Sequence, residues 1–117
     1  MADTGESFGE TIKRHRRELG LTQRQVAEKL GVDVTYLSKL ENGRGEAPSE
    51  KLVRELASEL KADPEELLAL AGRVPSEIRE LAQDDVEFAR FLRRLPEMDE
   101  AQRKKLYRQA SPGRGKP

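Results

Sequence analysis

The feature that most constrains the fold of this chain is a pair of short helical patterns separated by about two residues. Thr22 is a good N-cap for the first pattern, whose apolar residues recur at helical spacing until Gly31. Asp33 can begin a second helix that runs to about Asn42. So short a connection predicts two helices that cross at a tight turn and share one core.

Residues of this pair have distinct steric roles. Ala27 is small where the two helices approach each other, and Gly31 permits the positive φ that reverses the chain. The side chains expected to seal the pair onto a core are Val26, Leu30, Val32, Leu37 and Leu40. Those expected on the opposite, outward face of the second helix are Val34, Thr35, Tyr36, Ser38 and Lys39. This outward set is able to contact base edges in a DNA major groove, which admits one helix.

A preceding helix is predicted from Phe8 to about Leu19, with Gly20 as its stop. The stripe expected to be buried, from i, i+4, i+7, i+11 spacing, is Phe8, Ile12, His15 and Leu19. His15 is the one histidine of the chain, and no cysteine is present. We therefore interpret His15 as an interior packing residue and not as a ligand or a pH switch.

Two further helices complete a set of five. Ser49 after Pro48 opens the fourth, and the residues expected on its apolar face are Leu52, Val53, Leu56 and Leu60. Asp63 and Pro64 are the N-cap and first residue of the fifth, which runs to Ala71 and Gly72. The sequence shows no strand-like alternation, so the predicted fold class is all-α. We place this first domain at residues 8–72.

Residues 73–110 are predicted to be a helical extension. Its segments are 75–82, 84–95 and 98–110, and Pro96 separates the last two. The middle segment carries Phe88, Phe91, Leu92 and Leu95, more apolar surface than a small appended helix readily hides. We interpret these four residues as a dimer or partner interface; packing against the chain's own first domain is the alternative. Residues 1–7 and 111–117 are predicted to be disordered.

The composition excludes several classes of function. Without cysteine and with one histidine, the chain has no disulfide, thiolate zinc site, cysteine nucleophile or histidine-pair metal site. We find no paired carboxylates in an apolar setting, no nucleophile–base pair and no phosphate-binding glycine loop. The acidic residues Asp84, Asp85 and Glu87 are accounted for by a helix start. We expect no enzyme activity, no catalytic residue, no metal and no cofactor.

Charge and hydropathy narrow the choice further. The 22 basic and 22 acidic residues cancel, so any attraction for nucleic acid must come from a local surface. The longest apolar stretch, residues 67–71, is far shorter than the roughly 20 residues that span a bilayer. We therefore expect a cytoplasmic protein with no membrane association.

The pair of helices resembles the Xre family, the helix-turn-helix class of phage lambda-type repressors and Cro proteins. The resemblance covers about residues 8–72. It is carried by the phrases Leu-Thr-Gln at 21–23, Ala-Glu-Lys-Leu-Gly-Val at 27–32 and Leu-Ser-Lys-Leu-Glu-Asn-Gly at 37–43. It implies a five-helix, lambda-repressor-like DNA-binding domain.

The resemblance also implies roles for individual residues. Gln23 would meet the phosphate backbone and brace the recognition helix, and we count Arg24 beside it among the DNA contacts. Base-reading positions fall on Val34, Thr35, Ser38 and Lys39. Asn42 and Arg44 fall on backbone-contacting positions. Tyr36 has two open roles, as a DNA contact or as a cover on neighbouring helices.

Arg16 and Glu41 occupy positions that often form a structural ion pair in this family. The sequence departs from the family pattern at three positions. His15 stands where an aliphatic residue is usual, Asp33 replaces the more common serine or threonine cap, and Glu46 puts an acidic group near the expected phosphate.

These features predict a sequence-specific regulator of transcription that binds double-stranded DNA, as a homodimer that represses from a palindromic operator. One alternative is a partner-controlled regulator, either antitoxin-like or a repressor inactivated by a protease, with the extension as the point of control. Another is a protein-interaction module that has kept the fold and lost DNA binding.

Overall fold

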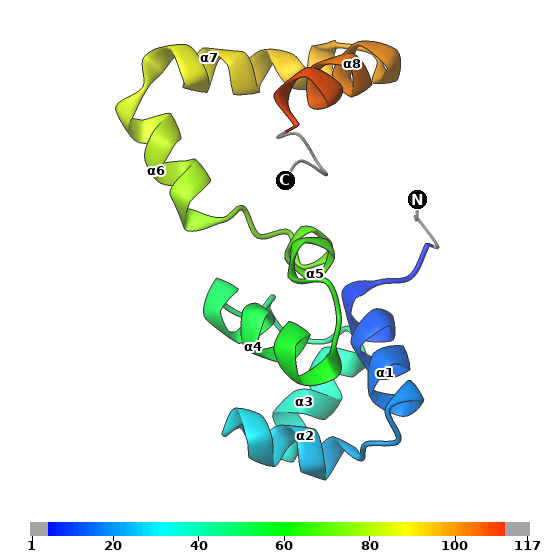
Figure 1. Ribbon diagram of the computed structural model, residues 1–117. Helices are drawn as coiled ribbons and strands as arrows, with labels where there is room; N and C mark the ends of the chain where they lie inside the picture. The colour runs from blue at the N-terminus through cyan, green and yellow to red at the C-terminus, as the bar shows by residue number, and fades with distance from the viewer. Residues whose placement is uncertain (1–4, 112–117) are drawn as a thin grey trace. The chain divides into compact units, whose positions relative to one another are not determined.

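The computed structural model describes residues 5–111, and over this range it holds helices and no strand (Figure 1), as the sequence predicts. The first five helices are α1 Phe8–Glu18, α2 Gln23–Leu30, α3 Val34–Glu41, α4 Glu50–Leu60 and α5 Pro64–Leu70. The others are α6 Ser76–Asp84, α7 Val86–Arg94, the 3-10 helix η1 Leu95–Glu97 and α8 Glu100–Ala110. Two compact units divide between Pro75 and Ser76, three residues beyond the predicted boundary.

Side-chain caps begin the helices of the first unit where the sequence predicts them. The Thr22 hydroxyl accepts a hydrogen bond from the backbone N–H of Gln25 at 3.0 Å, and the Gln25 side chain accepts one from the Thr22 N–H at 2.8 Å. The Asp33 carboxylate accepts from the Thr35 N–H at 2.7 Å. Two more predicted N-caps are confirmed at Ser49 and Asp63. Each such cap stabilises its helix by about 1 kcal/mol.

The N-terminal end of the first unit lies earlier in the chain than predicted. Ser7 and Glu10 form a reciprocal capping box at the start of α1. Glu6 accepts a hydrogen bond from Nε of Arg14 at 2.9 Å. Ser7 and Glu6 therefore belong to the first unit. Residues 1–4 and 112–117, most of the two ends predicted to be disordered, lie outside the described residues.

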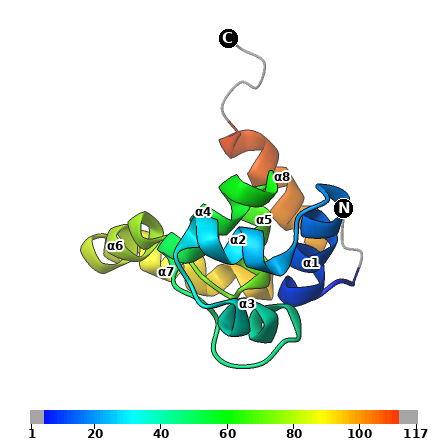
Figure 2. The ribbon, with the colours of Figure 1, turned by 90° about the horizontal axis from the view of Figure 1, so that it is seen from below.

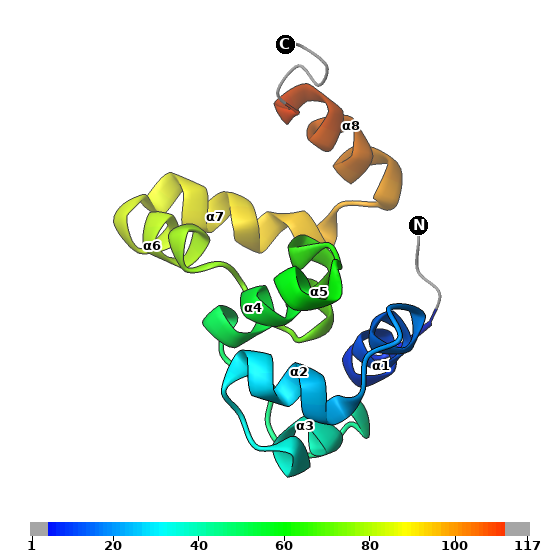
Figure 3. The ribbon, with the colours of Figure 1, turned by 60° about the horizontal axis from the view of Figure 1, so that its bottom comes forward.

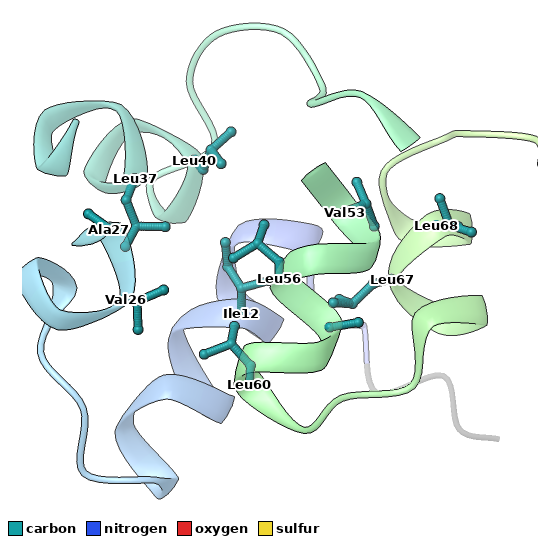
Figure 4. Close-up of a cluster of buried hydrophobic side chains, with 11 residues drawn as sticks. Ile12, Val26, Ala27, Leu37, Leu40, Val53, Leu56, Leu60, Leu67 and Leu68 are labelled. Atoms are coloured by element: carbon teal, nitrogen blue, oxygen red, sulfur yellow. The ribbon is translucent and has the colours of Figure 1, made fainter. Parts of the chain in front are cut away.

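The core of the first unit is aliphatic and is centred on α4, whose Val53 and Leu56 have no exposed surface. Its members are Ile12, Val26, Ala27, Leu37, Leu40, Val53, Leu56, Ala57, Leu60, Leu67 and Leu68. Figure 4 shows the side chains of α2 and α3 on one side of Leu56 and those of α5 on the other. Helix α4 packs on α1, α2 and α5. Each large aliphatic side chain buried in this way contributes roughly 1.5–3 kcal/mol.

The turn between α2 and α3 has the predicted left-handed glycine. Gly31 has a φ of 72°, which a residue without a Cβ adopts freely. The N–H of Val32 then donates to the Ala27 carbonyl at 3.0 Å and closes the end of α2. Helices α2 and α3 consequently pack directly on each other, at one end of the first unit (Figure 3).

The buried face of α1 differs from the predicted stripe. The structure buries Gly9, Thr11, Ile12 and Arg16 on this helix. Leu19 is 39% exposed, so its predicted burial is wrong, and His15 is only half-buried. The helix turns the charged Arg16 inward because an acidic residue of α3 neutralises it there. Apolar spacing by itself could not reveal that partner.

Gly9 lies where α1 approaches α3 closely, a contact that the sequence pattern did not predict. A Cβ on Gly9 would overlap the carbonyl oxygen of Leu40 and would lie 2.6 Å from that of Glu41. Both neighbours are backbone atoms, which cannot rotate aside. Only glycine therefore lets the first turn of α1 lie against the end of α3.

The second unit contains α6, α7, η1 and α8. Helices α6, α7 and α8 lie within about two residues of their predicted bounds, whereas η1 was not predicted as an element. Asp85 caps α7 by accepting from the Phe88 N–H at 3.1 Å, and Asp99 forms a capping box with Gln102 at α8. None of the described side chains of this unit is buried. None of the helices in the described range is long and apolar enough to cross a membrane.

Replacing Gly9 with alanine is expected to destabilise the first unit. A helix interior normally gains about 0.5–1 kcal/mol when alanine replaces glycine. Here the added methyl overlaps two carbonyl oxygens, so we expect Gly9→Ala to lower the free energy of unfolding by about 1–3 kcal/mol. Urea denaturation measures the change, with Arg17→Ala on the exposed face of α1 as a control that should change little. A stabilised Gly9→Ala variant would contradict the close approach.

Candidate nucleic-acid interface

Helix α3 presents a polar face outward because its apolar face is fixed in the core. Leu37 and Leu40 are 1% and 5% exposed. Thr35, Lys39 and Asn42 are exposed and Ser38 is half-buried. Helical spacing puts these four residues on one side of α3, which we call the polar ridge. Within the ridge, the Asn42 amide donates to the Ser38 hydroxyl at 3.5 Å.

Two other residues predicted to face outward are placed differently. Val34 and Tyr36 are half-buried and pack against the aliphatic core. The packing of Tyr36 on the core is consistent with the cover on neighbouring helices. Its contact with DNA, like that of Val34, stays a prediction.

A buried ion pair fixes α3 to α1. The Nε of Arg16 donates to one carboxylate oxygen of Glu41 at 2.6 Å, and a terminal nitrogen donates to the other at 3.0 Å. Another guanidinium nitrogen donates to the Leu21 carbonyl at 2.8 Å, just before α2. The pair inferred from the family resemblance is therefore confirmed.

Gln23 connects α2 to the same carboxylate. Its side-chain amide donates to Glu41 at 2.9 Å, so the first residue of α2 is tied to the last residue of α3. This contact is the bracing expected of Gln23, whereas its contact with phosphate stays a prediction. Helices α1, α2 and α3 thus converge on one carboxylate.

The environment of Glu41 decides its charge. Burial raises the pKa of Glu41, but the hydrogen bonds from Arg16 and Gln23 outweigh burial and hold that pKa below its ordinary value. The hydrogen bond to Glu41 raises the pKa of Arg16. Both groups are therefore charged at neutral pH.

The predicted phosphate contacts lie at the ends of the two helices. Arg24 is exposed in the first turn of α2. Arg44 is exposed after α3, where its N–H donates to the Lys39 carbonyl at 2.9 Å. In the described part of the chain, Arg24, Lys39 and Arg44 have no ion-pair partner. These three cations are available to an external anion.

Other predicted sites are placed as follows. The residues predicted to form an interface, Phe88, Phe91, Leu92 and Leu95, lie on α7 and at its C-terminal end. Phe91 is 42% exposed and the other three are half-buried. Among residues 5–111, no group of three or more histidine, aspartate or glutamate side chains is arranged to hold a metal ion.

A capped α2, a left-handed glycine turn and an outward polar face on α3 together define a helix-turn-helix domain. The family model described as a helix-turn-helix domain matches residues 7–70, and the chain belongs to this family. The resemblance to the Xre class of helix-turn-helix proteins is thereby supported.

Curated relatives carry names of the same class. The chain is 37% identical over 79 residues to the HTH-type transcriptional regulator RghRB of Bacillus subtilis (strain 168), covering 65% of this chain and 57% of that protein. It is 38% identical over 69 residues to the HTH-type transcriptional repressor RghR of the same strain, covering 59% and 51%. The chain therefore spans little more than half the length of these relatives.

A solved structure is similar over more of the chain. One chain of the complex of the SinR and SinI proteins is 25% identical to this chain, with a TM-score of 0.50. The similarity covers 89% of this chain and 99% of the other. It therefore extends beyond the 64 residues that the family model matches at 7–70.

Acid should weaken the link between α1 and α3 through Glu41. Because the folded-state pKa of Glu41 lies below its unfolded value, its ionised form contributes stability above the unfolded pKa. That stability is lost as the pH falls through the lower, folded pKa. At neutral pH, Glu41→Gln leaves Arg16 as an uncompensated buried charge and should cost about 3–5 kcal/mol.

The measurement is urea denaturation of the wild type and Glu41→Gln between neutral pH and the acid limit of folding. The difference between their free energies of unfolding should shrink below the ordinary glutamate pKa of 4.5. Glu18→Gln, at the exposed surface, is the control and should differ little from the wild type. A large difference that stays constant with pH would contradict this account of Glu41.

Proposed function

We propose that this chain is a transcription regulator that binds double-stranded DNA sequence-specifically, as a homodimer that represses by occupying a palindromic operator. The observation that carries the proposal is the polar ridge, exposed on a helix whose other face is fixed in the core. A B-DNA major groove admits one such helix. Membership of the helix-turn-helix family and the names of the relatives support the same function.

The ridge has the chemistry for reading bases. Lys39 can donate to guanine, Ser38 can donate or accept, and Thr35 adds a hydroxyl and a methyl group. Val34 and Tyr36 are half-buried, so only the exposed part of each side chain can contact DNA. The residues proposed to meet phosphate are Gln23, Arg24, Asn42 and Arg44.

The second unit supports dimerisation through α7. Helices of about ten residues are marginal in water unless an amphipathic face is packed, and this unit buries none of its described side chains. Phe88, Phe91, Leu92 and Leu95 supply the apolar face.

Charge favours a second copy as the occupant of that face. Asp84 and Asp85 directly precede α7 and Glu87 lies in its first turn, whereas the C-terminal half of α7 carries Arg90, Arg93 and Arg94. Two copies of α7 paired antiparallel about a two-fold axis would put each acidic end against the other copy's basic end. A palindromic operator needs two copies of α3 about 34 Å apart, in successive major grooves, and a dimer supplies the two copies.

A second candidate is regulation by a protein partner through residues 76–110. It is favoured by the similarity to a chain of the SinR and SinI complex, which covers more of this chain than the helix-turn-helix domain. On this alternative, α7 would receive the partner in place of, or in competition with, the second copy.

Selection from a random duplex library tests the proposed DNA reader. We expect the intact chain to enrich a palindrome at moderate salt, and the double variant Thr35→Ala, Lys39→Ala to lose this enrichment. Each base contact removed should cost about 1–3 kcal/mol of discrimination. Affinity for the enriched duplex should fall steeply as salt rises, because phosphate contacts release counterions.

The matched control is Lys29→Ala, which removes an exposed lysine of α2 that lies beside Glu55 and Glu59 of α4. It should retain the enriched sequence. No enrichment by the intact chain at any salt concentration would reject the DNA reader and favour a protein-interaction module.

Sedimentation equilibrium tests the dimer interface. Phe91→Asp puts a charge into the proposed α7 contact, and we expect it to weaken dimerisation at least a hundredfold, or about 2.7 kcal/mol. The first unit has its own aliphatic core, so the monomer should keep the helices of that unit. Tyr107→Asp, at an aromatic residue of α8 that is also exposed, is the control. A Phe91→Asp protein as dimeric as the wild type would reject α7 as the interface.

A further inference from the structure

Arg73 joins the end of α5 to the connection between α3 and α4. Its Nε donates to the Pro48 carbonyl at 2.8 Å, and a terminal nitrogen donates to the Ala47 carbonyl at 2.8 Å. Its own backbone N–H donates to the Leu68 carbonyl at 2.9 Å, which closes α5. The backbone of Arg73 is therefore held by α5 while its side chain holds the connection, residues 42–49.

The connection has few other hydrogen bonds, although its Pro48 is buried. Its first residues are tied to α3, since Gly43 N–H donates to the Leu40 carbonyl and Arg44 N–H to the Lys39 carbonyl. In the part of the chain that the structure describes, the hydrogen bonds to the backbone of residues 45–48 come from Arg73. Figure 2 shows this connection as a wide loop beside α3.

The path of this loop matters because it carries opposite charges. Arg44 and Glu46 are both exposed and lie two residues apart. An arginine here would attract a DNA phosphate and a glutamate would repel it. Whichever path the loop takes therefore decides which of the two charges is nearer to the phosphate beside α3.

The contact also needs arginine in particular. A planar guanidinium presents several N–H groups in a fixed fork, which here reaches two successive carbonyls. A lysine at the same position keeps the positive charge but has a single ammonium nitrogen. Arg73→Lys therefore separates the geometry of the contact from its charge.

We propose that Arg73 is a positioning residue for DNA binding, which fixes the loop after α3 so that Arg44, and not Glu46, meets the phosphate backbone. The inference rests on the proposed function. It adds a residue that follows the C-terminal end of α5 and need not touch DNA itself.

The test is a double-mutant cycle on the intact chain, with the duplex enriched by the wild type as the probe. Arg44→Gln should reduce the slope of log affinity against log salt by about 0.9, the share of one phosphate, and lower affinity about tenfold. Arg73→Lys should give a similar loss and a similar change in slope. Adding Arg73→Lys to Arg44→Gln should lower the affinity for the duplex little further, because the two residues act through one contact.

Arg14→Lys is the matched control, since Arg14 is also an exposed arginine whose guanidinium makes two contacts, with Glu6 before α1 and with Glu18 on α1. It should leave affinity and salt slope unchanged. Thermal unfolding of each variant distinguishes a general loss of stability from a displacement of the loop.

Two results would overturn the inference alone. One is an additive loss in the double variant, and the other is an unchanged salt slope in Arg73→Lys despite a lower affinity, which would indicate a structural role only. If the wild type binds no duplex at all, the proposed function fails and takes this inference with it.

Discussion

The bidentate pair between Arg16 and Glu41 is the interaction on which the arrangement of the first three helices depends. Two buried charges are costly to remove from water, and they are tolerated here because each hydrogen bond of the pair is well made. The pair turns the polar Arg16 inward on α1, sets α3 against α1 and gives Gln23 a partner at the start of α2. Leu37 and Leu40 direct the ridge of α3 away from the core, and the ion pair fixes the end of that helix against α1.

The two units of the chain are built on different physical principles. The first has a continuous aliphatic core and caps at its helix starts, so its fold is stable through contacts within the chain. The second has caps but no buried side chain among its described residues. A domain that recognises DNA bases needs a surface of fixed shape. A dimerisation segment can instead bury its apolar side chains against another molecule. The proposed function assigns these two roles accordingly.

Much of the candidate interface could be predicted from the sequence, and the failures have a common cause. Thr22, Asp33 and Gly31 were identifiable because a cap or a left-handed turn is decided within a few residues. The prediction for α1 failed at Leu19, and Gly9 was missed, because the face that a helix buries depends on what lies opposite. Arg73 was missed for the same reason, since nothing near it in sequence shows that two carbonyls lie within its reach.

The sequence by itself determined where the helices of this protein begin and end, that they are short and amphipathic, and which face of α3 is polar. These properties follow from hydrogen bonds and side-chain spacing over about four residues, which the local sequence contains. Only the tertiary structure decided the inward turn of Arg16, the contact of Gly9 with the end of α3 and the hold of Arg73 on its loop. Arg16 and Arg73 each lie 25 residues from the partner they bind, so their roles depend on how the core brings distant segments together.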